Sequence, residues 1–195
     1  MAPANPELRE LVKEMNRSVI AGRFQKENCE PLDAAGEIYP TAILPVLAIN
    51  RAGEERVFPM KWGFNQRGRL LINARAETAA EKLTFRESWK SHRCIIPVSC
   101  YFEWEHDEKR RPGQKYAIRP VMPGVIHLAG LYRMEEEIPV FVILTRPAAK
   151  SLAWMHDRMP VMLSTDKAKE WIQPGTNPDD IMKHCLTETH WYKAG

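Results

Sequence analysis

The spacing of apolar residues predicts one clear helix near the beginning of the chain. Between residues 5 and 17, apolar side chains recur every three or four positions, which places them on one face of a helix. These side chains are Leu8, Leu11, Val12 and Met15. Asn5 suits the cap of this helix, and Pro6 suits its first turn. The next segment, 18–36, has no clear period and is predicted to be a loop.

From residue 41 onwards, the pattern is that of short β-strands. Six segments are apolar throughout or alternate between apolar and polar residues, and Gly, Pro or charged turns bound them. They cover 41–50, 55–64, 92–105, 115–120, 124–133 and 139–146. Several of the 15 prolines fall in these segments, which favours short, bent or edge strands.

Three further segments carry helix signals. Part of 76–91 is predicted to be helical, with Thr84 as a candidate cap before the sequence FRESW. Short helices are predicted in 164–172 and 177–185, and the second has Asn at its cap followed by Pro. Because strands and helices do not alternate regularly, we predict a single α+β domain across residues 1–195.

The composition is that of an ordinary globular protein. Of the 195 residues, 44% are hydrophobic and 27% are charged, and no apolar run is long enough to span a membrane. The first residues lack an apolar signal core, so we expect a cytoplasmic protein without membrane contact. The net charge of +3 permits a nucleic-acid partner without requiring one.

Cysteine spacing and the absence of common motifs argue against several classes of enzyme. The cysteines at positions 29, 94, 100 and 185 form no CxxC pair, so neither a metal site nor a disulfide framework is predicted. No Walker loop, GxGxxG, HExxH or GxSxG sequence occurs. These absences disfavour nucleotide hydrolysis, dinucleotide redox chemistry, zinc peptidase activity and an α/β-hydrolase triad, and we expect no cofactor.

The stretch MKWGFNQRGRLLINARAET holds polar side chains where a predicted strand meets a helix. Asn73 there suits hydrogen bonding to a ligand, but taken alone it is favoured as a helix cap by roughly three to one. Arg75 taken alone is typical of a surface or structural ion pair. Trp62 taken alone is typical of a core residue.

A second candidate lies in SCYFEWEHDEK, where residue types alternate along a predicted strand. Glu103 shares one strand face with Tyr101 and Glu105, while Phe102 and Trp104 lie on the other. A solvent-facing position is the default for Glu103, because glutamate is mostly exposed. If this face instead forms the floor of a pocket, desolvation favours the protonated carboxyl, and Glu103 becomes a candidate general acid or base.

A third candidate is HDRMP, which precedes an apolar strand. His156 suits general acid–base chemistry because imidazole titrates near neutral pH, but a structural hydrogen-bonding role is favoured when it is taken alone. Asp157 is either an orienting carboxylate or a turn residue. Arg158 suits either bidentate phosphate binding or an ordinary salt bridge.

Taken together, seven stretches resemble the SRAP (SOS response-associated peptidase) family of abasic-site processing proteins. They are GEIYPTAILPVL, MKWGF, INARAET, F.ES....RCIIPVSCYFEW, LAGLY, FVILTRPA and HDRMPVML. Each stretch is a weak signal alone, but seven in the right order are specific.

The resemblance implies a curved, barrel-like mixed or antiparallel β-sheet with a few peripheral helices, and a positively charged groove for single-stranded DNA. Family members form a covalent link to an abasic site through a cysteine that follows the initiator Met in a Met-Cys-Gly-Arg motif. Self-removal of Met frees the cysteine amine, and amine and thiol react with the ring-opened sugar aldehyde to give a thiazolidine. The implied partner is single-stranded DNA containing abasic sites, and we expect a monomer.

Carried over by matching motifs, the resemblance implies a pocket and a set of DNA-binding residues. The pocket residues are Asn73, Glu103 and His156. The DNA-binding residues are Pro40, Thr41, Trp62, Arg75, Thr145 and Arg158.

The chemistry implied by the family accounts for these residue types. Forming and losing a carbinolamine requires proton transfers, which a carboxylate and an imidazole supply near neutral pH. We assign opening of the sugar ring to His156, imine chemistry and reversal of the link to Glu103, and orientation of the amine to Asn73. Trp62 and the segment 39–41 are expected to stack or wedge beside bases, and the arginines to bind phosphates. Phe102 and Trp104 are expected to form the packed face of their strand.

The sequence departs from the family pattern at its beginning. It starts Met1-Ala2-Pro3-Ala4 without the Met-Cys-Gly-Arg motif, and the internal Gly-Arg-Phe of IAGRF is interpreted as a chance match. In the family, a strand bearing the cysteine precedes the first helix, so this strand is predicted to be missing here. As written, the chain is predicted not to form the thiazolidine.

Two other functions are therefore kept open. One is a module that binds single-stranded or damaged DNA without reacting, with salt-sensitive and sequence-independent affinity. The other is a peptidase that acts on other proteins, as the family name suggests. Self-removal of the initiator Met does not require such a general activity.

Overall fold

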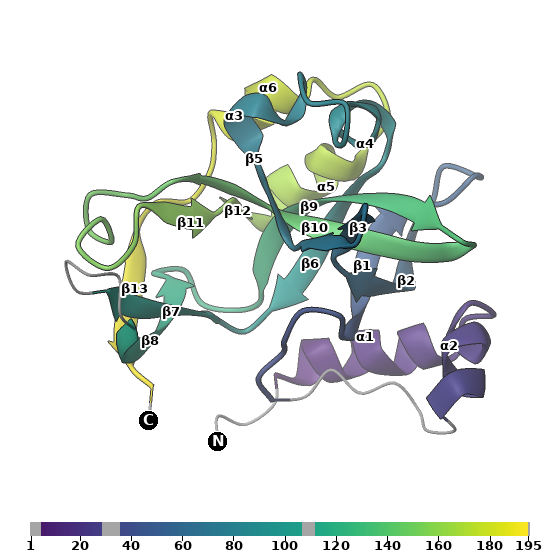
Figure 1. The fold of residues 1–195 in the computed structure, drawn as a ribbon, viewed down its shortest axis with the longest axis horizontal. Helices are drawn as coiled ribbons and strands as arrows, with labels where there is room; N and C mark the ends of the chain where they lie inside the picture. The colour runs from purple at the N-terminus through teal and green to yellow at the C-terminus, as the bar shows by residue number, and fades with distance from the viewer. Residues whose placement is uncertain (1–4, 29–35, 107–111, 195) are drawn as a thin grey trace.

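Five strands rich in buried apolar residues close into the barrel-like core of the protein (Figure 1). They are β1 (Ile43–Ile49), β2 (Glu55–Trp62), β6 (Arg93–Val98), β9 (Ile126–Glu135) and β10 (Ile138–Pro147). The order is β10-β2-β1-β6-β9, and β9 pairs with β10 to complete the ring. Of these five pairings, β10–β2 is parallel and the other four are antiparallel. This computed structural model describes residues 5–28, 36–106 and 112–194.

Short strands extend the barrel on both sides of β10 and along β9. Strand β5 (Asn73–Arg75) runs parallel to β10, and β11 (Arg158–Pro160) runs antiparallel to it. Strand β12 (Met162–Leu163) pairs with β9. A separate hairpin joins β3 (Phe64–Gln66) to β4 (Arg69–Leu71) through Arg67 and Gly68, which both have the left-handed backbone of a tight hairpin turn.

A second sheet lies beside the barrel and was only partly predicted. It contains β7 (Tyr101–His106), β8 (Pro112–Pro120) and β13 (Thr189–Lys193), in the order β13-β8-β7. The prediction of one strand over 92–105 is wrong, because the chain turns at Ser99 and Cys100 and its halves, β6 and β7, join different sheets. Strand β13 was not predicted, since its sequence THWYK is short and mostly exposed.

Six helices surround the sheets among the described residues. They are α1 (Pro6–Asn16), α2 (Ala21–Asn28), α3 (Ala76–Ala79), α4 (Arg86–Ser91), α5 (Thr165–Ile172) and α6 (Pro178–Met182). In Figure 1, α1 and α2 lie below the barrel and the other four lie above it. The predicted loop over 18–36 is wrong where α2 stands, and residues 29–35 lie outside the described part of the chain.

Helix caps match the sequence signals in two of three cases. The Asn5 and Asn177 side chains accept hydrogen bonds from backbone N–H groups of α1 and α6, as predicted. Thr84 is not a cap, because α4 begins one residue later, with Phe85 at the cap position and without a side-chain hydrogen bond. The short α4 is stabilised instead by burial of Trp89 against Trp171 of α5.

Alternating residues of the barrel strands enter two buried clusters. One cluster combines residues of β6, β9 and β10 with apolar side chains of α3 to α6. The other combines all five barrel strands with β8 and with Leu152 and Met155, which follow β10. The predicted α+β fold with a barrel-like sheet and peripheral helices is confirmed.

Candidate nucleic-acid interface

Strand β10 aligns most of the expected DNA-binding residues. In the parallel ladder Asn73 lies beside Ile143 and Arg75 lies beside Thr145, while Thr145 faces Pro160 on the antiparallel side. Asn73 and Arg75 are exposed, and Ala74 between them is buried, because successive side chains on a strand point to opposite faces. The register therefore places Asn73 and Arg75 on one open face beside Thr145.

Asn73 is the first residue of β5 and not a helix cap. The helix that follows, α3, has Arg75 at its cap position without a side-chain hydrogen bond. The prediction that favoured capping for Asn73 taken alone is therefore wrong. Its exposed amide is open to a ligand on this face.

Arg158 is fixed by a carboxylate that was not predicted as part of the site. Its guanidinium nitrogens donate to the two carboxylate oxygens of Glu77 at 2.5 and 2.8 Å, and Nη2 also donates to the Thr145 carbonyl at 2.8 Å. The hydrogen bond from Arg158 lowers the pKa of Glu77, and the same contact raises the pKa of Arg158. Arg158 thus forms the salt bridge that sequence reasoning kept as the alternative to phosphate binding.

His156 has hydrogen-bond partners suited to both of its protonation states. Its Nδ1 lies 3.0 Å from the Arg158 backbone nitrogen, whose N–H donates to the neutral ring. The same Nδ1 lies 3.3 Å from the Asp157 carboxylate, which accepts from the charged ring. The side chain is 36% exposed, so solvent and ligand can reach it.

Glu103 lies on the face of β7 that turns toward the buried core. Its register partner is Tyr116, which is 6% exposed, and its face-neighbour Tyr101 packs on the same apolar cluster as Tyr116. Glu103 is half-buried, with a carboxylate oxygen 3.3 Å from the Trp104 backbone nitrogen. The face of β7 that carries Tyr101 and Glu103 is therefore partly buried against the barrel cluster and not open to solvent throughout.

Phe102 and Trp104 do not form the packed face that the sequence predicted. Both rings contact the ammonium group of Lys115, at 4.3 and 5.1 Å from the ring centroids. Lys115 in turn forms an ion pair with Glu37. The prediction is wrong because β7 turns its other face, with Tyr101, toward the barrel cluster.

Tyr101 is a site feature that the sequence reasoning missed. Its hydroxyl is buried and has no hydrogen-bond partner among the described residues. Burial, and then the charge of Glu103, raise the pKa of this phenol well above its ordinary range. A buried hydroxyl without a partner is uncommon, so a bound ligand or water is its natural partner. The available signal was that Tyr101 and Glu103 share one strand face.

Trp62 and Thr41 are fixed at the end of β2 by backbone contacts. The Trp62 ring lies nearly parallel to Phe141, with centroids 6.3 Å apart, and its indole N–H donates to the Ile72 carbonyl at 2.9 Å. The Thr41 N–H donates to the Trp62 carbonyl at 2.8 Å, and Thr41 has a left-handed backbone with φ of 77°. The adjoining Pro40 is half-buried, and Tyr39 is 61% exposed.

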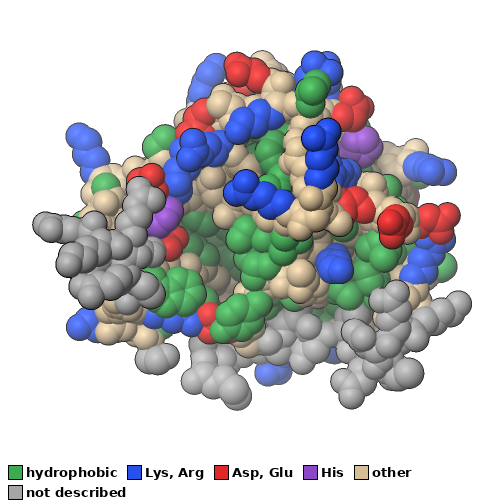
Figure 2. Space-filling model, viewed as in Figure 1, with side chains coloured by type: hydrophobic (Ala, Val, Ile, Leu, Met, Phe, Trp, Pro, Cys, Tyr) green, Lys and Arg blue, Asp and Glu red, His purple; other side chains and the backbone are tan. Residues whose placement is uncertain are grey.

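A hollow of about 730 Å³ adjoins Thr41 and is lined by several cations. Lys61, Arg67 and Arg133 contribute to its wall, together with Glu135 and Glu136. Figure 2 shows Lys and Arg side chains spread over one face of the molecule, together with hydrophobic and acidic side chains. In the wall of the hollow Arg133 pairs with Glu135, and the basic side chains there are compatible with nucleic-acid binding.

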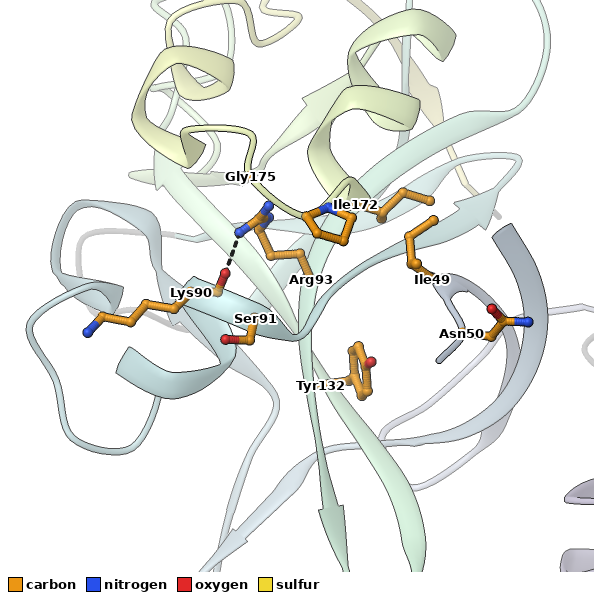
Figure 3. A pocket seen from close by; sticks show the side chains of 9 residues that line it. Ile49, Asn50, Lys90, Ser91, Arg93, Tyr132, Ile172 and Gly175 are labelled. Atoms are coloured by element: carbon orange, nitrogen blue, oxygen red, sulfur yellow. Dashed lines mark hydrogen bonds between the residues drawn. The ribbon is translucent and has the colours of Figure 1, made fainter. Parts of the chain in front are cut away.

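A second pocket, of about 370 Å³, surrounds Arg93 and has a structural explanation (Figure 3). The buried guanidinium donates to five backbone carbonyls. These belong to Trp89, Lys90, Trp171, Gln173 and Thr176. With its five N–H groups engaged, Arg93 has no donor left for a ligand, and none of the predicted site residues lines this pocket.

The described cysteines do not resemble activated nucleophiles. Burial raises the pKa of Cys94, Cys100 and Cys185, so the reactive thiolate is disfavoured at each. Cys29 lies outside the described residues. The internal Gly-Arg-Phe begins at Gly22 and lies within α2.

The described residues contain neither a metal-binding cluster nor a membrane-spanning helix. No group of three or more His, Cys, Asp or Glu side chains is arranged to hold a metal ion within 5–28, 36–106 and 112–194. No helix in that part of the chain is long and apolar enough to cross a membrane.

The fold is shared with bacterial proteins of known crystal structure. One is a protein from Bacteroides thetaiotaomicron, with a TM-score of 0.73 and 20% identity over 99% of this chain and 90% of that chain. Another is a phage-related protein from Bordetella bronchiseptica, with a TM-score of 0.71 and 24% identity over 92% of each chain. At these identities the likeness establishes the fold class alone.

Sequence comparison assigns the family. The SRAP family, "SOS response associated peptidase", matches residues 7–194, and the chain belongs to it. The chain is 33% identical to abasic site processing protein YobE of Bacillus subtilis over 71% of this chain and 68% of that protein. It is 35% identical to abasic site processing protein YedK of Escherichia coli over 53% of this chain and 47% of that protein. The predicted family is confirmed.

The structure brings the expected residues together in two groups. Asn73, Arg75, Thr145 and Arg158 meet at β10, and His156 stands two residues before Arg158, the first residue of β11. Glu103 lies in the second sheet, whose core-facing side packs on the same apolar cluster as Trp62 and Ile143. The two groups are thus joined through one buried cluster.

Proposed function

We propose that this protein processes abasic sites in DNA and binds the damaged strand across the face built by β5, β10 and β11. The observation that carries the proposal is the register of β10, which places Asn73 and Arg75 beside Thr145, to which Arg158 donates a hydrogen bond. Membership of the SRAP family and the names of its relatives support the choice of damaged DNA as the substrate.

In this proposal the three pocket residues divide the proton transfers and the positioning. His156 assists opening of the sugar ring, because its ring nitrogen has a partner both when neutral and when charged. Glu103 exchanges protons during imine formation and reversal, and Tyr101 supplies a nearby buried hydroxyl. Asn73 orients the attacking amine through its exposed amide.

DNA is held in the proposal by contacts that do not read sequence. Arg75 and Arg158 bind phosphates, and Thr145 supports them from the strand between. Pro40, Thr41 and Trp62 form a rigid edge against which the bases on one side of the lesion pack. The substrate is single-stranded, because bases must be splayed to reach such an edge.

Covalent linkage requires a cysteine with a free α-amine, which no internal cysteine has. A protein of the printed sequence, with Ala2 after the initiator, is therefore proposed to bind without forming the thiazolidine. A version that carries a Met-Cys-Gly-Arg strand ahead of α1 is proposed to react. Non-covalent binding to damaged single-stranded DNA is the second candidate function, and it is favoured by the lack of an activated thiol among the described cysteines.

The test is a crosslinking assay with three matched proteins. Single-stranded DNA with one abasic site is incubated with the printed sequence, with the Met-Cys-Gly-Arg version and with a Met-Ser-Gly-Arg control, and each sample is run on a denaturing gel. We expect a shifted band for the cysteine version alone. A stable shifted band from the printed sequence would contradict the non-covalent proposal. Failure of all three to prefer abasic over intact DNA in a binding assay would overturn the proposed function.

A further inference from the structure

Three aromatic side chains form a partly exposed cluster at the end of the molecule that holds β11 and β13 (Figure 1). Tyr116, Trp154 and Trp191 pack edge to face, with ring centroids 5.3 to 5.4 Å apart. Tyr116 is buried, but Trp154 and Trp191 remain 45% and 46% exposed. Two indole rings of this exposure at one place are a large apolar surface to leave in water.

The cluster connects the two groups of proposed pocket residues. Tyr116 is the register partner of Glu103 in the second sheet, and Trp154 stands two residues before His156 in the segment between β10 and β11. Contact between Tyr116 and Trp154 therefore joins the second sheet, which carries the carboxylate on β7, to the segment that carries the imidazole. Trp154 is close in sequence to His156, and Tyr116 pairs with Glu103 across the sheet.

The exposed rings are held rigidly. The Trp154 indole N–H donates to the Ser151 carbonyl at 3.0 Å, which fixes the ring in addition to its two aromatic contacts. Trp191 is positioned by the β13–β8 ladder, opposite Ile118. A preorganised aromatic surface loses little conformational entropy when a planar ligand stacks on it.

The cluster has charged neighbours of both signs, with exposed cations beside the exposed rings and the Glu105 carboxylate beside the Tyr116 hydroxyl. Lys193 is the register partner of Tyr116 and shares the strand face of Trp191, and its side chain is exposed. Lys150, in the same segment as Trp154, is also exposed. Cations beside solvent-exposed aromatic rings are the combination by which single-stranded nucleic acid is bound, with bases on the rings and phosphates on the cations.

We propose that Trp154, supported by Trp191, stacks a nucleobase adjacent to the abasic site, on the His156 side of the pocket. This rests on the proposed function, because it extends the same DNA path beyond the reacting sugar. The base that flanks the lesion lacks a stacking partner on one side, since the abasic position has no ring. Trp154 replaces that missing neighbour and so fixes the lesion beside His156.

The experiment removes the two partners of the stack one at a time. The probe is a fluorescently labelled single strand of thymidines with a central tetrahydrofuran abasic analogue, and binding is followed by anisotropy. In two further probes, the nucleotide 5′ or 3′ to the analogue is replaced by a second abasic spacer. Wild type is compared with Trp154→Ala, with Trp154→Phe, and with Val19→Ala, which changes an exposed apolar residue between α1 and α2.

We expect Trp154→Ala to weaken binding of the base-flanked probe by about 5- to 150-fold, the range for loss of one base–aromatic stack. On the probe that lacks the stacked base, the same substitution should have almost no effect, and this probe identifies which flank is stacked. Trp154→Phe should retain most of the affinity, and Val19→Ala should retain all of it.

Equal losses on all probes would overturn the stacking proposal, because they would mean that Trp154 only supports the His156 segment. Unchanged affinity of Trp154→Ala would overturn it as well. If the wild type binds abasic and intact strands with equal affinity, the proposed function is overturned instead. This holds whatever the difference between probes in the loss of affinity caused by Trp154→Ala. Thermal unfolding of each variant identifies a loss of binding that comes from misfolding.

Discussion

The ion pair between Glu77 and Arg158 limits how strongly the face built by β5, β10 and β11 can attract DNA. Both Nη atoms of the Arg158 guanidinium donate to the Glu77 carboxylate, so a phosphate must compete with it. Substitution of Glu77 by Gln removes the charge but keeps one hydrogen-bond acceptor for Arg158. We therefore expect Glu77→Gln to bind single-stranded DNA more tightly than wild type.

The size of the effect follows from Coulomb's law. With roughly 7 Å between the Glu77 carboxylate and a phosphate on Arg158, the repulsion is about 0.6 kcal/mol at an effective dielectric constant of about 80, and about 2.4 kcal/mol at about 20. These energies correspond to about 3-fold and about 50-fold in affinity. Because salt screens exposed charges, the lower part of this range, about 3- to 10-fold, is expected near 0.1 M salt.

Anisotropy titrations over a range of salt concentrations provide the measurement. Because Glu77→Gln no longer offsets the charge of Arg158, the plot of log affinity against log salt should steepen by up to about 0.7. Arg158→Ala should bind more weakly than wild type, and the double variant should show a much smaller gain from Glu77→Gln. An unchanged affinity for Glu77→Gln would refute the reasoning. A gain of equal size without Arg158 would show that the effect is not transmitted through that arginine.

Two further predictions concern stability. Gly130→Ala should destabilise the barrel by about 1–3 kcal/mol in urea unfolding, because its Cβ would lie 2.9 Å from the Val142 carbonyl oxygen and 3.0 Å from the Cys94 sulfur, and unchanged stability would contradict this close packing. The pKa of Glu77 is lowered from 4.5 in the folded state, so its ion pair stabilises the fold above pH 4.5 and this contribution is lost as pH falls below that value. The difference in stability between wild type and Glu77→Gln should therefore shrink between pH 5 and pH 3, and a difference that grows toward acid pH would disprove the assignment.

The barrel was predictable in its strands but not in its closure. Periodic apolar segments located β1, β2, β8, β9 and β10 to within a few residues, because burial dictates residue type at each of these positions. The turn at Ser99 and Cys100 was missed, since apolar residues continue on both sides of it. Pairing of β9 with β10 to close the ring depends on contacts distant in sequence, which no local pattern encodes.

The sequence was sufficient to name candidate site residues, but not the residues that contact them in the fold. Asn73, Glu103 and His156 were identified because their types stand in family motifs, but taken alone each was assigned a structural or solvent role. Glu77 was missed because its carboxylate meets Arg158 only after β5 and β11 pair with β10. Trp154 lies in no periodic segment, and the aromatic cluster it joins forms only when the fold brings it against rings of β8 and β13.

The five carbonyl contacts of Arg93 bear on how the protein unfolds. One side chain of β6 ties the C-terminal ends of α4 and α5 to the barrel, so neither helix can detach without leaving a buried positive charge and several carbonyls unpaired. Local opening of the helical layer therefore costs a large share of the global free energy of unfolding. Helices α4 and α5 and the barrel itself should lose amide protection together, as a single cooperative unit, in hydrogen exchange.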